Sequence, residues 1–245
     1  MTDRNRRTLI PLAALAGLFV LLTAWMDPWR MVLSTVFPTL DKVVYPLAPF
    51  RRLVAEHILL VGSSSILAST AGLCIGIAVT RQWGREFLPA VNALASMGQT
   101  FPPVAVLALA VPAVGFGFKP TVIALFLYGL LPVLRNTIAG LQTLDPAVLE
   151  AASGMGMNPL QILTLVEIPL ALPVIMAGVR ISTVINIGTA TLGATIGAGG
   201  LGKPIIAGLI GENPAYIIEG AVLVGLFAIL VDGVLGIVSR DRADG

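Results

Sequence analysis

The sequence predicts an all-α protein that crosses a membrane with about six transmembrane helices. Hydrophobic residues make up 56% of the 245 positions and charged residues only 11%, whereas a soluble domain carries charge at roughly 25% of its positions. A chain with so little charge cannot cover a water-facing surface, so much of its surface must face lipid. In addition, the apolar residues gather into stretches of about 20 residues or more, the length that a helix needs to cross a bilayer.

The predicted spans follow one another along the chain, separated by polar connections. They cover Thr8–Trp25, His57–Thr80, Leu88–Val114, Pro120–Leu141, Leu170–Ile196 and Tyr216–Val238. The first is read as a retained span, because no small-x-small cleavage site follows it and more spans come later. The chain therefore divides into an N-terminal helix with its connector (1–54), a transmembrane domain (55–238) and a C-terminal tail (239–245).

The few ionisable and sulfur-containing side chains exclude several classes of function. A net charge of +2 is too small for a nucleic-acid-binding surface. Cys74 is the only cysteine, so it forms no intrachain disulfide, and its apolar neighbours predict a packing role. His57 is the only histidine and starts a span, where we expect a polar residue at the membrane interface rather than a metal ligand. A membrane-embedded enzyme would need a catalytic constellation within the spans, and the sequence presents none.

The segment between the fourth and fifth spans, residues 143–169, predicts a pair of short helices. The first begins with Asp145 as N-cap and Pro146 at the first helical position. It ends at Gly154 or Gly156, since glycine tolerates left-handed backbone angles. Its small apolar residues share one face. That face consists of Ala147, Val148, Ala151, Ala152 and Met155.

The second helix of this segment is capped as well. Asn158 is its predicted N-cap, Pro159 follows at the first position, and Gln161 completes a capping box. Pro169 is expected to close the helix. A well-capped helix pair with a small apolar face is typical of a docking element for a partner protein. The alternative on physical grounds is a helix pair that lies in the lipid interface.

The same segment resembles the Glu-Ala-Ala signature of ATP-binding-cassette (ABC) importer permeases. That signature consists of Glu-Ala-Ala, three residues, Gly, nine residues, and an aliphatic-x-aliphatic-Pro ending. The spacing here agrees at each step, over Glu150, Ala151, Ala152, Gly156, Val166, Ile168 and Pro169. The resemblance implies a type I ABC importer permease core, in which this loop is cytoplasmic and its first helix couples to the ATPase.

The resemblance also orients the chain. Because an even number of predicted spans precedes the loop, a cytoplasmic loop implies a cytoplasmic N-terminus. Basic residues alone favour this orientation only slightly, with eight on the cytoplasmic side against six outside.

Three further segments resemble the osmoprotectant branch of these permeases, whose members import glycine betaine, choline, carnitine or proline betaine. They are residues 98–107, 185–192 and 196–202, and the likeness extends over residues 55–238. It implies a bacterial inner-membrane complex of two permeases, identical or homologous, with ABC ATPase subunits and a periplasmic or lipid-anchored substrate-binding protein. ATP and magnesium would be held by the ATPase, and this chain would bind no cofactor itself. An amino acid or a sulfonate is the alternative solute.

Uncharged polar residues in the third and fifth spans are candidates for the solute path. Those in the third span precede two prolines, and non-helical backbone in a membrane is tolerated only inside protein or beside a wet cavity. Those in the fifth span share one helix face. The candidates are Gln99, Thr100, Ser182, Asn186 and Thr189. Such groups suit a zwitterion that must not be held tightly, and the alternative is that they form hydrogen bonds between helices.

Two other functions are disfavoured by the sequence. Gly197–Pro204 fits the phosphate-loop pattern G-x-x-x-x-G-K, but Pro204 replaces the Ser or Thr that binds magnesium, so we expect a turn and no ATPase activity in this chain. An ion-coupled secondary transporter would usually need a mid-span carboxylate, which we do not expect here. Arg180 lies within the fifth span, where it would snorkel, line a wet cavity or mark a later start of the helix.

Overall fold

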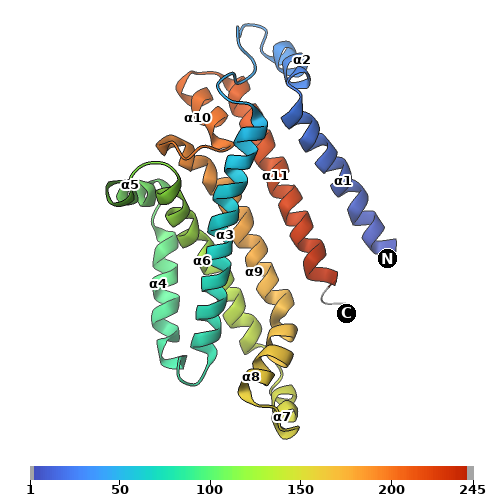
Figure 1. Ribbon diagram of the computed structural model, residues 1–245, viewed down its shortest axis with the longest axis vertical. Coiled ribbons are helices and arrows are strands. Elements are labelled where there is room, and N and C mark those ends of the chain that lie inside the picture. The colour runs from blue at the N-terminus through green and yellow to red at the C-terminus, as the bar shows by residue number, and fades with distance from the viewer. Residues whose placement is uncertain (1–2, 242–245) are drawn as a thin grey trace.

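The computed structural model describes the backbone of residues 3–241 and the side chains of residues 9–97 and 100–239. Over these residues the chain is a bundle of helices without strands, as predicted (Figure 1). The long helices are α1 (Asp3–Ala24), α3 (Phe50–Thr80), α6 (Phe118–Gln142), α9 (Ile168–Thr189) and α11 (Pro214–Asp241). The shorter ones are α2 (Asp27–Val36), α4 (Leu88–Thr100), α5 (Pro103–Val114), α7 (Pro146–Gly154), α8 (Pro159–Ile162) and α10 (Gly202–Ile210). Short 3-10 segments, η1 (Arg85–Phe87) and η3 (Ala190–Ile196), and a π-helical segment, η2 (Leu163–Glu167), link them.

The bundle has two distinct ends. Figure 1 shows α7 and α8 projecting at one of them, the α7 end, whereas α2 and α10 lie at the other, the α10 end. Helices α1 and α11 run antiparallel, so that both termini point toward the α7 end.

Three helices form the centre of the bundle, with α6 packed against both α3 and α9. Glycines bring α3 and α6 close together. A Cβ atom on Gly72 would lie 2.8 Å from Cβ of Val133, and one on Gly76 would lie 2.7 Å from Cγ2 of Thr137. Small residues of this kind let helices associate in a membrane, where lipid is as apolar as the helix surfaces and van der Waals contact drives packing.

Four helical runs among the described residues are each long and apolar enough to cross a membrane. They are Phe50–Thr80, Phe118–Gln142, Pro159–Ile196 and Pro214–Ser239. The first predicted span corresponds to α1, which meets the same criteria together with α2 although the two helices are bent by 85°. Five of the predicted spans therefore have a helical counterpart at the expected place.

The third predicted span, Leu88–Val114, is two helices rather than one. α4 ends at Thr100 and α5 begins at Pro103, with extended backbone at Phe101 and Pro102 between them. A proline lacks the N–H that an α-helix needs and forces the preceding residue into an extended conformation, so two consecutive prolines break the helix. α4 starts beside the end of α3, and α5 contacts η3 near the opposite end, so the pair still carries the chain along the bundle.

The connector of residues 26–56 contains a helix that the sequence did not predict. α2 turns its Trp29 and Leu33 inward, and the indole N–H of Trp29 donates to the carbonyl of Leu22 at 2.9 Å. The rest of the connector folds over the α10 end, where the backbone N–H of Tyr45 donates to the Glu219 carboxylate at 2.9 Å. α3 then begins at Phe50 rather than at His57.

Two single-residue expectations are wrong. His57 is fully buried instead of interfacial, with Nε2 3.1 Å from the carbonyl oxygen of Ile187 and the ring packed edge-on against Phe227. Cys74, expected to pack inside, is exposed on α3. Apolar neighbours in the sequence did not distinguish the two sides of α3, because lipid-facing and protein-facing residues are equally apolar.

The fifth span ends in a glycine-rich turn, as predicted. Gly197, Gly199 and Gly200 all have positive φ angles. The N–H of Gly200 donates to the carboxylate of Glu56 on α3 at 3.0 Å, and the ammonium group of Lys203 donates to the same oxygen at 3.3 Å. The turn leads into α10, a short helix that was not predicted.

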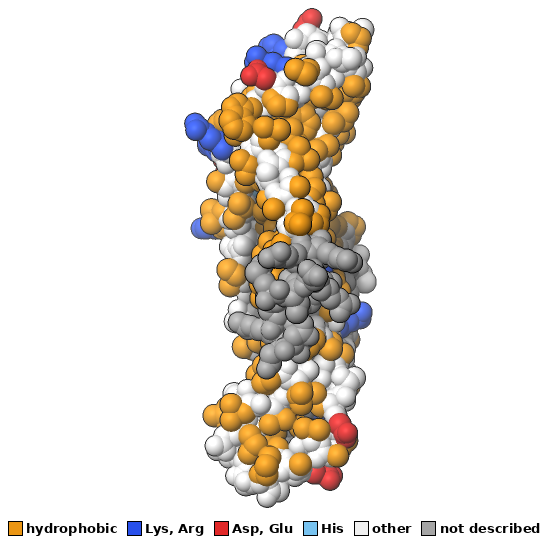
Figure 2. All heavy atoms as spheres, turned by 90° about the vertical axis from the view of Figure 1, so that its right-hand side faces the viewer, with side chains coloured by type: hydrophobic (Ala, Val, Ile, Leu, Met, Phe, Trp, Pro, Cys, Tyr) orange, Lys and Arg blue, Asp and Glu red, His pale blue; other side chains and the backbone are white. Residues whose placement is uncertain are grey.

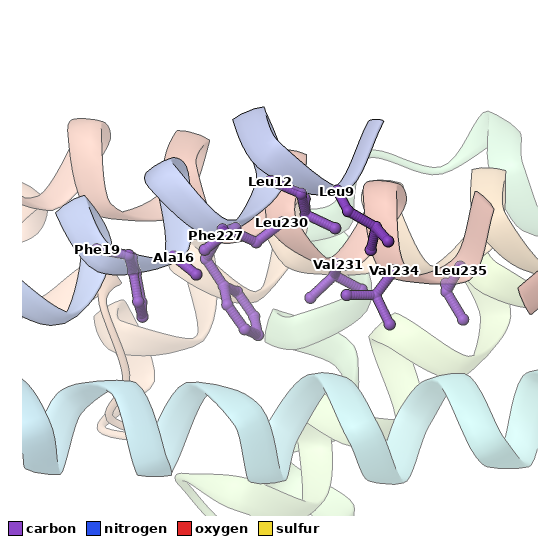
Figure 3. Close-up of a pocket in the computed structure, with 10 residues that line it drawn as sticks. Leu9, Leu12, Ala16, Phe19, Phe227, Leu230, Val231, Val234 and Leu235 are labelled. Atoms are coloured by element: carbon purple, nitrogen blue, oxygen red, sulfur yellow. The ribbon is translucent and has the colours of Figure 1, made fainter. Parts of the chain in front are cut away.

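An open apolar groove of about 510 Å³ lies between α1 and α11 (Figure 3). Its lining contains Leu9, Leu12, Ala13, Ala16, Phe19, Phe227, Leu230, Val231, Val234 and Leu235. None of these described side chains has a polar group, so they offer nothing that would recognise a charged solute. Figure 2 shows the right-hand side of the view in Figure 1, with hydrophobic side chains above and below the grey atoms and acidic ones near the two ends. This distribution fits a surface in contact with lipid.

Candidate functional site

The loop between α6 and α9 begins with α7, whose two ends match the prediction. The carboxylate of Asp145 accepts the N–H of Ala147 at 2.9 Å, and Pro146 occupies the first position of the helix. α7 ends at Gly154, and Gly156 follows with a φ of +83°. Residues that carry a Cβ atom are strained in this left-handed region. The short helix therefore has a fixed start and a sharp end.

α8 carries the predicted capping box. The side-chain oxygen of Asn158 accepts the N–H of Gln161 at 2.9 Å, and the side-chain oxygen of Gln161 accepts the N–H of Asn158 at 2.9 Å. The expected helix end at Pro169 is wrong, because the chain stays helical through η2 into α9. Pro169 lies in the first turn of α9, where a missing N–H is tolerated.

The apolar face of α7 is only partly covered by the chain itself. Ala152 is 2% exposed, but Met155 is 76% exposed and Ala147 and Ala151 are exposed as well. Glu150 also points to the outside. The surface continues along α8 and η2 through residues such as Leu160 and Leu165. An exposed apolar surface of this kind is typical of a contact with another protein or with the membrane surface.

The last part of the signature connects the loop to the bundle. Val166 and Ile168 are half-buried, and Pro169 is exposed. Between them the buried carboxylate of Glu167 meets the guanidinium group of Arg81 at the end of α3. No sequence signal indicated this contact, since the two residues lie 86 positions apart.

The polar candidates of the fifth span fall at a helix crossing. Ser182 and Asn186 are fully buried. The amide nitrogen of Asn186 donates to the hydroxyl groups of Ser64 at 3.3 Å and Ser65 at 3.1 Å on α3. Gly129 of α6 lies against both, because a Cβ atom there would be 2.6 Å from Oγ of Ser182 and 2.9 Å from Nδ2 of Asn186. Within this single chain, Asn186 thus forms hydrogen bonds between helices.

The other candidates lie in more open positions. Thr189 is half-buried near the end of α9. Thr100 is exposed at the end of α4, where its hydroxyl donates to the carbonyl of Met97 at 2.7 Å. The side chain of Gln99 lies outside the described residues. The assignment of all these residues to the solute path stays a prediction.

Arg180 is paired within the fifth span. Its Nε donates to Oδ1 of Asp232 at 2.9 Å and its Nη2 to Oδ2 at 2.8 Å, so the pair joins α9 to α11. Both side chains border an open groove of about 560 Å³. The two carboxylates of the sixth span, Asp232 and the buried Glu219, both lie within α11. Arg180 balances the charge of Asp232, which makes a carboxylate tolerable at membrane depth.

Residues 72–244 match the family described as "Binding-protein-dependent transport system inner membrane component". The chain belongs to this family. It is thus a permease subunit of an ABC importer and a multi-pass membrane protein, as the Glu-Ala-Ala signature implied.

Known relatives of this permease are similar over most of their length. The chain is 42% identical to the glycine betaine/carnitine/choline transport system permease protein OpuCB of Bacillus subtilis. The aligned region covers 76% of this chain and 84% of that protein. It is also 42% identical to the osmoprotectant import permease protein OsmY of Salmonella typhimurium, covering 74% and 76% respectively. A solved structure of the MetNI methionine ABC transporter in an inward-facing conformation shares the fold, with a TM-score of 0.71 and 23% identity over 79% of this chain and 95% of that one.

Proposed function

We propose that this permease forms the translocation path for an osmoprotectant with a quaternary ammonium group, such as glycine betaine, choline or carnitine. The similarity to permeases of osmoprotectant systems supports this solute class. The candidate path residues are uncharged (Gln99, Thr100, Ser182, Asn186 and Thr189). Uncharged polar groups can contact such a solute without the strong attraction that an opposite charge on the protein would exert.

The observation that carries the proposal is the exposed apolar face of α7 on a doubly capped, two-turn helix. A rigid helix of this kind can transmit a displacement, and its exposed alanines and methionine can seat in an apolar cleft of a partner. We assign that partner to ABC ATPase subunits, which hold ATP and magnesium and supply the energy. The α7 end, and the N-terminus with it, is then cytoplasmic. A second copy or a homologous permease completes the path, and a periplasmic or lipid-anchored binding protein delivers solute to the α10 end.

The test is solute uptake by the complex of permease, ATPase and binding protein in proteoliposomes. Glycine betaine, choline and carnitine are compared with an amino acid that lacks a quaternary ammonium group. We expect uptake of at least one quaternary ammonium compound that requires ATP and persists when ionophores dissipate the ion gradients. Uptake of the amino acid alone would overturn the solute class, and uptake that follows an ion gradient without ATP would overturn the ABC mechanism.

A further inference from the structure

An ion pair joins the coupling loop to the end of α3. Arg81 directly follows α3, and Glu167 is the last residue of the π-helical segment η2. Nη1 of Arg81 donates a hydrogen bond to Oε1 of Glu167 at 3.1 Å, and Nη2 lies 2.7 Å from Oε2. Nη2 also donates to the hydroxyl of Thr80 at 3.2 Å. Two contacts between the charged groups fix their orientation as well as their distance.

This ion pair is sheltered from water. The side chain of Glu167 is 10% exposed and that of Arg81 is 26% exposed. Taking two charges out of water is unfavourable, so a sheltered ion pair contributes little net stability, and its best-attested use is to specify one arrangement of the elements that it joins. Here those elements are the loop and α3.

Glu167 also lies where the helix geometry changes. η2 inserts a π-helical segment between α8 and α9, and such segments are frequently found at functional sites. α7 packs against α8 and η2, so a force applied to α7 enters the bundle through this segment. In Figure 1, α7 and α8 project beyond the end of α9, where nothing else in the described chain encloses them.

We propose that Arg81 and Glu167 are positioning residues that make the coupling loop and α3 move together. This inference rests on the proposed function of α7 as the helix that docks on the ATPase. The loop is joined covalently to α6 and to α9, and the ion pair adds a direct contact with the end of α3. With the pair intact, a displacement of α7 moves α9 and α3 around α6, which packs against both. Without it, the displacement reaches α3 only through the packing of α3 against α6 and α9, and less solute is moved for each ATP hydrolysed.

The test measures solute uptake and ATP hydrolysis in the same reconstituted complex. Arg81→Gln and Glu167→Gln each remove one charge and keep a polar side chain of similar size. We expect the ratio of solute transported to ATP hydrolysed to fall roughly tenfold, a typical size for coupling between two sites, while the ATPase still co-purifies with the permease. The exchanged pair R81E/E167R is expected to recover most of the ratio.

A matched control lies at the other end of the same helix. Arg52 forms an exposed ion pair with Glu56, and its side chain is 68% exposed. Arg52→Gln is expected to leave the ratio of solute to ATP unchanged, which separates the effect of the Arg81 pair from the general loss of an ion pair on α3.

The outcomes separate this inference from the proposed function. Wild-type ratios in both single variants would overturn the inference alone. Loss of ATPase binding in the single variants, without recovery in the exchanged pair, would also overturn it, because the residues would then be structural. A wild-type complex without ATP-dependent uptake would overturn the proposed function and this inference together.

Discussion

Two glycines near the end of α7 have different backbone conformations. Gly156 has a φ of +83°, whereas Gly154 is the last residue of the helix, and a Cβ atom on either would meet no other atom within 4 Å. Proline fixes φ at about −65°, so it cannot adopt the positive φ angle of position 156. An alanine there would cost about 1–2 kcal/mol.

We therefore expect Gly156→Pro to abolish ATP-driven uptake while membrane insertion stays normal, with Gly156→Ala intermediate. Uptake and the amount of permease in the membrane are measured together. Gly154→Ala is the control and should transport normally. Normal uptake by Gly156→Pro would rule out a role for this break in coupling.

A second prediction at the scale of one residue concerns the effect of a substitution at Gly129 on thermal stability. A Cβ atom there would lie 2.6 Å from Oγ of Ser182 and would push α6 away from α9. Overpacking of this kind costs about 1–3 kcal/mol, so Gly129→Ala should lower the melting temperature of the purified permease in detergent. Gly188→Ala on α9 adds its methyl group where no atom lies within 4 Å, and it should leave the melting temperature unchanged or raise it. Equal melting temperatures for both variants would contradict this packing account.

At the scale of helices, Arg180 and Asp232 hold α9 and α11 together. The side chains are 31% and 41% exposed, between a surface pair and a buried one. Loss of one partner should therefore cost about 1–3 kcal/mol, less than for a fully buried pair. We expect Asp232→Leu and Arg180→Met each to lower the thermal stability of the permease. The double variant should lose less than the sum of the two, since it leaves no unpaired charge. Strict additivity in this double-mutant cycle would mean that the pair does not couple the helices.

The helices show which features a sequence pattern can specify. α3, α6, α9 and α11 were predicted because long apolar runs have few alternatives in a membrane. α2 and α10 were missed because they are short, and α2 has a proline in its first turn and lies inside a charged connector. The caps of α7 and α8 were predicted from residues at most three positions apart. The pairs Arg81–Glu167 and Arg180–Asp232 join residues 86 and 52 positions apart, and only the folded chain brings them together.

At the scale of the whole molecule, the two ends are built differently. At the α10 end, the connector, the glycine-rich turn and α10 are held in place by Glu56 and Glu219. At the α7 end, the apolar face of a short helix stays uncovered. In the proposed function, the ATPase drives the subunit at the α7 end and solute arrives at the α10 end.

The assignment of α7 to the ATPase predicts the orientation of the chain, which cysteine labelling can measure. In a Cys74→Ala background, which should stay unlabelled, Thr39→Cys places a thiol in the connector at the α10 end and Ser153→Cys places one on α7, both at exposed positions. A membrane-impermeant maleimide should label Thr39→Cys in spheroplasts and Ser153→Cys only after permeabilisation. Co-expression of the ATPase should then protect Ser153→Cys, because the docked subunit covers α7. Labelling of Ser153→Cys from the outside would reverse the orientation, and with it the assignment of α7 to an ATPase in the cytoplasm.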